Sequence, residues 1–196
     1  MKKRRMYSIA AVAALAAMSA GTALADGKGN GNGGGKDNDN TFATKLIGYN
    51  ETPLTLNSTA GGTFVATVNE DGTAINYTLS YHDVVSGVTQ AHIHFGRPAI
   101  TGQIVLFLCT NLAPPTGVPV PQMCPTPSGT ISGTLTAADV IARPTQGIDA
   151  GAAGLAEMIK AMRAGAAYAN VHSTTFPSGE IRGAIGPTDE DENDND

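Results

Sequence analysis

The sequence predicts a mainly β protein, an antiparallel β-sandwich or barrel with two short helices. Several short segments alternate apolar and polar residues with a period of two, which is the pattern of half-buried strands. Turn-forming residues separate these segments, and only two segments have the spacing of a helix. The segments lie within residues 42–187, a length that suits one ordinary domain.

Three strands are predicted in the first third of this domain. Residues 42–48 form the first, and a turn at 50–53 follows because the residue before a proline avoids the helical region. Residues 62–68 and 74–82 alternate apolar and polar side chains on either side of 69–72, a hairpin turn signal. These two strands are therefore expected to pair with each other.

The strand predicted over residues 88–95 carries two histidines on one face. His92 and His94 are two residues apart, so they point to the same side, while the apolar residues between them point to the other. A third histidine, His172, lies in a similar segment much later in the chain. Imidazoles at i and i+2 of one strand can share a metal ion, and a neighbouring strand can add a third.

Four further strands are predicted after residue 100. Residues 104–108 are a continuous apolar run, which is typical of a central strand buried on both faces. Residues 129–135 form another strand, and residues 166–172 and 180–185 form a final hairpin. Because of its continuous apolar run, the strand at 104–108 is expected in the middle of the sheet.

Two helices are predicted between the last strands. Residues 136–139 resemble a capping box, with Asp139 in place of the usual Glu, and predict a short helix to about residue 141. Residues 150–162 place apolar side chains at helical spacing, and Gly165 follows as a stop signal.

A cleaved signal peptide is predicted over residues 1–25. Residues 2–5 are all basic, and residues 6–18 form an apolar stretch rich in alanine. Small residues precede the bond between Ala25 and Asp26, which is the predicted cleavage site. The stretch is too short for a transmembrane helix, and no later apolar run is long enough. We expect a secreted, periplasmic or cell-envelope protein; an uncleaved membrane anchor is the less favoured alternative.

Both flanks of the domain are expected to be disordered. Residues 26–41 form a linker rich in Gly, Asn and Asp, and residues 188–196 form a tail with six acidic residues. The leader contains four of the twelve basic residues and none of the seventeen acidic ones. Eight basic residues therefore remain, and the mature net charge is −9. This excess argues against nucleic acid and anionic membranes as partners.

The two cysteines, Cys109 and Cys124, predict one disulfide in an exported protein. The segment between them contains four prolines, so the bridge would close a loop without secondary structure. Closing a loop of this length contributes about 3 kcal/mol in the chain-entropy model. The alternative, a thiol metal site or a reactive nucleophile, is disfavoured outside the cytosol.

A series of motifs in a fixed order resembles the CHRD (chordin-type) domain family. The motifs lie at 46–53, 60–62, 91–96, 102–105, 133–136, 167–173 and 177–183. The resemblance covers residues 42–187. It implies an immunoglobulin-like or superoxide-dismutase-like sandwich, found singly in exported bacterial proteins. It also implies a non-enzymatic binding or envelope module, whose partner would be an unknown extracellular protein or envelope component.

The His-x-His-Phe-Gly segment is also similar, more faintly, to the copper-binding strand of copper–zinc superoxide dismutases. That similarity implies a copper or other transition-metal protein with possible redox activity. The candidate ligands for copper or zinc are His92, His94 and His172, with His82 as a fourth if its strand lies alongside. No aspartate-plus-histidine loop for a zinc half is present.

The alternative for the histidines is a buried hydrogen-bonded cluster without a metal. Asn170, Glu180 and Arg182 belong to the same predicted hairpin as His172, and Glu180 and Arg182 share one strand face. Each buried imidazole has two nitrogens to satisfy, and a buried charge needs a partner. No Gly-x-Ser-x-Gly motif or other catalytic arrangement is recognised, so an enzyme is disfavoured.

Overall fold

The computed structural model describes residues 40–188, which form eight strands and one α-helix. The elements are β1 (Thr41–Ile47), β2 (Gly61–Val68), β3 (Ala74–His82), β4 (Val88–Phe95), β5 (Gln103–Thr110), β6 (Gly129–Thr136), α1 (Gly151–Arg163), β7 (Ala167–Ser173) and β8 (Ile181–Pro187). Among these residues, no helix is long and apolar enough to cross a bilayer. The predicted signal peptide with its Ala25–Asp26 cleavage site, the linker up to residue 39 and the tail from residue 189 lie outside the described residues.

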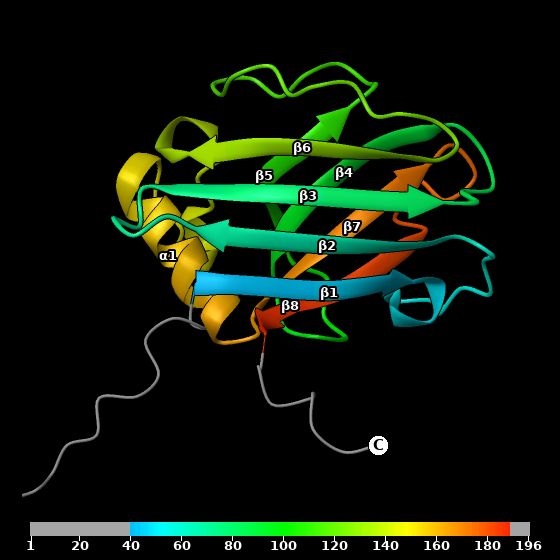
Figure 1. Cartoon of the computed structure of the whole chain (residues 1–196), viewed down its shortest axis with the longest axis horizontal. Coiled ribbons are helices and arrows are strands. Elements are labelled where there is room, and N and C mark those ends of the chain that lie inside the picture. Colours follow the sequence, from blue (N-terminus) through cyan, green and yellow to red (C-terminus); the bar gives the residue numbers. More distant parts are fainter. Residues whose placement is uncertain (1–39, 189–196) are drawn as a thin grey trace, which may run out of the picture. The chain divides into compact units, whose positions relative to one another are not determined.

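All strand pairings are antiparallel, and the strand order is β5-β4-β7-β8-β1-β2-β3-β6. Figure 1 shows that the sheet forms two layers: β6, β3, β2 and β1 lie in front, and β5, β4, β7 and β8 cross behind them. The predicted antiparallel sandwich or barrel is therefore confirmed. It is built from one continuous sheet.

The β2–β3 hairpin illustrates how the alternating sequence makes the core. Phe64 is paired with Leu79, and both side chains are completely buried between the layers. The Asn69 side chain accepts hydrogen bonds from the backbone N–H groups of Thr73 and Ala74, at 2.8 and 2.9 Å, and so closes the turn. The apolar face of each strand therefore faces the core, as period two requires.

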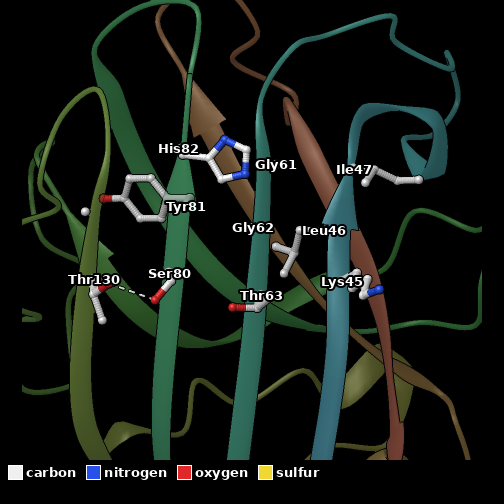
Figure 2. A pocket seen from close by; sticks show the side chains of 11 residues that line it. Lys45, Leu46, Ile47, Gly61, Gly62, Thr63, Ser80, Tyr81, His82 and Thr130 are labelled. Carbon is white, nitrogen blue, oxygen red and sulfur yellow. Dashed lines mark hydrogen bonds between the residues drawn. The ribbon is translucent and has the colours of Figure 1, made fainter.

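The outward face of the front layer is polar. The Ser80 and Thr130 hydroxyls are hydrogen-bonded across β3 and β6 at 2.7 Å. Figure 2 shows this face, where a cavity of about 580 Å³ lies over the bare backbone of Gly61 and Gly62. The His82 ring borders this cavity.

The helix α1 begins and ends within one residue of its predicted bounds. Leu155, Met158 and Met162 are at most 1% exposed, and the helix packs against β6, β7 and β8. The predicted second helix is only a single 3₁₀ turn, Ala137–Asp139, although its capping box is present. The chain becomes extended directly after this turn, at Val140, and so the α-helix does not form.

The strand β5 lies at one end of the strand order, so its prediction as a central strand is wrong. Val105, Leu106 and Leu108 are nevertheless buried, and other segments cover the free edge of the strand. The Ile141 N–H donates to the Val105 carbonyl at 2.9 Å, and the Thr110 N–H donates to the Gln122 carbonyl at 2.9 Å. Burial on both faces therefore does not require a second neighbouring strand.

The predicted disulfide is confirmed. Cys109, on β5, is bonded to Cys124 with an S–S distance of 2.02 Å, and both residues are buried. The Asn111 side chain spans the same loop by donating to the Cys124 carbonyl and accepting from the Cys124 N–H. The disulfide and these bonds attach the proline-rich segment to the end of β5.

Candidate metal centre

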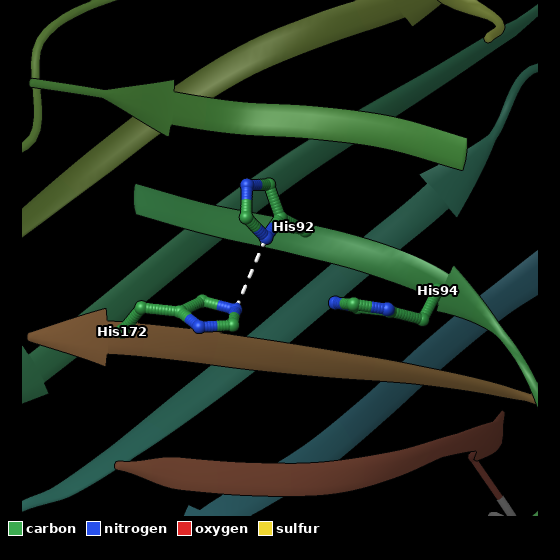
Figure 3. A group of neighbouring side chains, drawn as sticks. All are labelled: His92, His94 and His172. Atoms are coloured by element: carbon green, nitrogen blue, oxygen red, sulfur yellow. Dashed lines mark hydrogen bonds between the residues drawn. The ribbon is translucent and has the colours of Figure 1, made fainter. Parts of the chain in front are cut away.

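Three histidines come together on the outer face of the back layer (Figure 3). His92 and His94 project from β4, and His172 projects from the neighbouring strand β7. The register pairs His172 with Gln90, which places it diagonally across from His92. Ile93, which lies between the two histidines of β4, belongs to the hydrophobic core.

The imidazole nitrogens converge. His92 Nδ1 lies 3.1 Å from His172 Nε2, and Figure 3 shows a nitrogen of His94 directed toward the same space. One potential ligand atom from each ring lies within 4.8 Å of the other two. The three rings therefore form a group that could hold a metal ion.

Backbone carbonyls hold two of the rings from behind. His94 Nδ1 donates to the Gly102 carbonyl at 3.1 Å, and His172 Nδ1 donates to the Pro177 carbonyl at 3.0 Å. A proton fixed on Nδ1 leaves the Nε2 lone pair available on the inner side of each ring. Histidines that bind metals are usually held by a second hydrogen bond of this kind.

The rings retain nitrogens without a partner. His92 Nε2 and His94 Nε2 are buried and make no hydrogen bond among the described residues. His92 Nδ1 donates to His172 Nε2, because the Nδ1 proton of His172 is directed to Pro177. Unpaired buried polar atoms are costly, so an ion or a hydrogen-bond donor at His94 Nε2 would be favourable.

Burial keeps all three rings neutral. The exposed fractions of His92, His94 and His172 are 0, 6 and 7%. Loss of solvation lowers the pKa of His94 to about 4 and lowers the pKa of His172. The pKa of His92 is lowered strongly by its burial and, secondarily, by the two other rings. Neutral imidazoles are the form that binds metals.

Aromatic rings and one guanidinium enclose the site. The edge of Phe107 meets His92 with ring centroids 4.3 Å apart, and Tyr168 stacks on His94 at 4.5 Å. The Arg182 guanidinium lies 3.4 Å from the Tyr168 ring centre. Arg182 also donates to the carbonyls at positions 97 and 100, which holds the β4–β5 loop against the site.

Gly102 connects this loop to the site. Its carbonyl accepts from His94, and its N–H donates to the Tyr168 hydroxyl at 3.1 Å. A Cβ atom at this position would lie 1.9 Å from the Phe95 carbonyl oxygen. The close approach of the two backbones therefore requires glycine, and it positions the acceptor that orients His94.

The polar residues predicted beside the histidines make other bonds. Asn170 donates to Glu51 at 2.5 Å and to the Ile181 carbonyl at 3.0 Å. Glu180 accepts from the hydroxyl of Ser58 at 2.7 Å and from the backbone N–H at position 85. Among the hydrogen bonds of the described residues, those of Asn170, Glu180 and Arg182 do not reach an imidazole.

Glu51 is a buried acid that the sequence analysis did not single out. It is 6% exposed, and burial raises its pKa to about 7, although the bond from Asn170 and the charge of Arg182 oppose the shift. Gly179 has a φ of +128°, and a Cβ there would lie 2.7 Å from both side chains of the Asn170–Glu51 pair. In the sequence, Glu51 lies in a turn before a proline and within the motif at 46–53, and neither feature indicates burial.

The condition for His82 to be a fourth ligand, a strand alongside those of the other histidines, is not met. Its strand β3 lies between β2 and β6, in the other layer of the sandwich. The side chain is 65% exposed and bonds to Asp83 at 3.0 Å. The group of potential ligands among residues 40–188 contains only His92, His94 and His172.

Comparison with known families gives one match. The family model described as the CHRD domain matches residues 42–185, which include both histidine-bearing strands. Neither the curated proteins nor the solved structures contain a significant match to this sequence.

Proposed function

The chain belongs to the CHRD domain family, and from this premise we propose that it is an exported, non-enzymatic binding module of the cell envelope or the extracellular space. Membership of the family supports a binding module. The Cys109–Cys124 disulfide supports an oxidising compartment, because such bonds persist mainly outside the cytosol. The predicted signal peptide agrees with the same location.

The ligand we propose is a transition-metal ion, copper or zinc, bound by His92, His94 and His172. The observation that carries this proposal is the convergence of three buried, neutral imidazoles, two of which are held by backbone carbonyls. A purely structural cluster would use its ring nitrogens in hydrogen bonds, and His94 Nε2 has none among the described residues.

The spacing of the nitrogens fits an ion. Metal–nitrogen bonds of about 2.0 Å place neighbouring ligand atoms roughly 3.3 Å apart in a tetrahedral arrangement. His92 Nδ1 and His172 Nε2 are already 3.1 Å apart. His92 would bind through Nδ1 and carry its proton on Nε2, whereas the two other rings would bind through Nε2.

Metal uptake tests this proposal directly. The purified chain is stripped with a chelator, loaded with copper or zinc, desalted and analysed for bound metal. We expect one ion per chain for the wild type and loss of the ion in His94→Ala and His172→Ala. His82→Ala is the matched control, because it removes an exposed histidine of the other layer. Absence of stoichiometric metal in the wild type, or retention in both site variants, would refute the metal site.

A second candidate function is the binding of an extracellular protein or envelope component. The disulfide loop exposes apolar side chains: the exposed fractions of Leu112, Val120 and Met123 are 53, 75 and 76%. Exposed apolar groups on one loop favour a contact surface. Triple substitution of these residues by Ser should abolish capture of the chain by isolated envelope material, while His82→Ala should not. Equal capture of both variants would exclude the loop.

A further inference from the structure

The proposed site has no anionic ligand. Among residues 40–188, the group of side chains that could hold an ion consists of three imidazoles and contains no carboxylate or thiolate. Neutral ligands leave the charge of the ion uncompensated. A bound Cu⁺ would therefore keep a charge of +1, whereas Zn²⁺ or Cu²⁺ would keep +2.

The environment makes an uncompensated charge expensive. The three rings are at most 7% exposed, and the edge of Phe107 and the face of Tyr168 cover two of them. The Born cost of transferring an ion from water into such a site grows with the square of its charge, so it is about four times larger for a divalent ion.

Two nearby positive charges also disfavour a divalent ion. Arg182 lies on the Tyr168 ring that stacks on His94. The Arg143 guanidinium donates to the carbonyl of Ile104, the residue that β5 pairs with His94. Both cations repel a bound ion, and the repulsion increases with the charge of that ion.

The two buried acids do not act as ligands of the site. Glu51 is bonded to Asn170 and has a pKa raised to about 7, so part of its population is uncharged at neutral pH. Glu180 is bonded to Ser58 and is not a member of the ligand group. The site therefore has no carboxylate in contact with the ion position to offset a second positive charge.

A site with three ligands also suits Cu⁺ better than Zn²⁺ or Cu²⁺. Structural zinc sites have four protein ligands, a zinc site made of three histidines needs a water as its fourth ligand, and Cu²⁺ prefers a tetragonal arrangement. Cu⁺ can be satisfied by three donors and does not need a fourth ligand. None of the three described cavities, of about 580, 620 and 220 Å³, has any of the site histidines in its lining, so these cavities supply no water as a fourth ligand.

We infer that the three-histidine site binds copper as Cu⁺ and discriminates against Zn²⁺ and Cu²⁺. This inference rests on the proposed function, namely that the histidines bind a metal at all. It specifies the oxidation state of the bound ion, which is a reduced copper ion enclosed in a buried site made of imidazoles alone.

Competition titrations test the inference. The metal-free chain is titrated anaerobically with Cu⁺ against a colorimetric Cu⁺ chelator, and separately with Zn²⁺ and Cu²⁺ against chelators of known affinity. We expect Cu⁺ to bind at least about a hundredfold more tightly than either divalent ion. Equal or tighter binding of Zn²⁺ or Cu²⁺ would overturn the inference while leaving the metal site intact. Failure to bind any of the three ions would instead refute the proposed function.

A charge-changing variant gives a second, independent test. Phe107 is half-buried against His92, so Phe107→Asp adds a carboxylate beside the site, and Phe107→Leu is the uncharged control. We expect the aspartate variant to narrow the preference for Cu⁺ over Zn²⁺ by about tenfold or more, and the leucine variant to keep it. An unchanged preference in a folded aspartate variant would contradict the charge argument. If that variant does not fold, the affinities of the wild type decide.

Discussion

Replacement of Glu51 by Gln is expected to stabilise the protein at neutral and alkaline pH and to change little near pH 4. Burial raises the pKa of this carboxyl from 4.5 to about 7. Between these two values the folded protein holds the proton more tightly than the unfolded chain does. The contribution of Glu51 to the free energy of unfolding therefore decreases as the pH rises from about 4.5 through 7, and it then levels off.

The magnitude follows from the pKa difference of Glu51. A shift of about 2.5 pH units corresponds to about 3 kcal/mol, at 1.36 kcal/mol per unit. The side chain is only 6% exposed, so solvent screens little of this effect. Gln keeps an oxygen that can accept from Asn170, now at 2.5 Å from Glu51 Oε1, but it cannot ionise.

Urea unfolding of both proteins, from about pH 4 to pH 9, measures the effect. The difference in unfolding free energy between Glu51→Gln and the wild type should grow by about 3 kcal/mol across this range and then become constant. A difference that does not depend on pH would show that the carboxyl titrates near its ordinary pKa. A difference of the opposite slope would show that its ionised form is stabilised by the fold.

Three further changes have defined outcomes. In the Glu51→Gln background, acidification from about pH 6.5 to 4 should destabilise the chain, because burial lowers the pKa of His94 to about 4 and the unfolded chain takes up the proton first. Urea unfolding should show a loss of up to about 3 kcal/mol from this ring, and a flat profile would contradict the prediction. Gly102→Ala should cost about 1–3 kcal/mol and weaken metal uptake, since its Cβ would overlap a backbone oxygen of β4. Gly186→Ala is its control, with open space at the Cβ position, and equal melting temperatures for the two variants would refute the close-approach explanation. Replacing Cys109 and Cys124 by Ser should lower stability by about 3 kcal/mol, and unfolding curves that do not respond to this change would show that the loop is held without the disulfide.

Local patterns predicted those parts of the fold that depend on neighbouring residues. The period of two in β3 and β4 follows from the geometry of a strand, and the spacing of Leu155, Met158 and Met162 follows from that of a helix. The order of strands is not encoded by neighbouring residues, and so the apolar run of β5 wrongly predicts a place in the middle of the sheet. The apolar run of β5 indicates that the strand is buried. At the end of the sheet, however, this burial is provided by residues more than ten positions away in the chain.

The candidate site likewise has features that local sequence patterns predict and features that they do not. The sequence alone determined that His92 and His94 share a strand face, because side chains two residues apart on a strand point to the same side. It also identified His172 as a candidate on a second strand, and it identified the family whose domain includes both strands.

Only the tertiary structure decided that the three rings meet. The convergence requires β4 and β7 to be neighbours in one register, and it requires the carbonyls of Gly102 and Pro177 to orient two rings from behind. The tertiary structure also places His82 in the other layer, away from the site, and it places Glu51 in a buried position. Contacts across 80 residues of chain, such as that between His92 and His172, depend on strand order and covering loops, which no local pattern encodes.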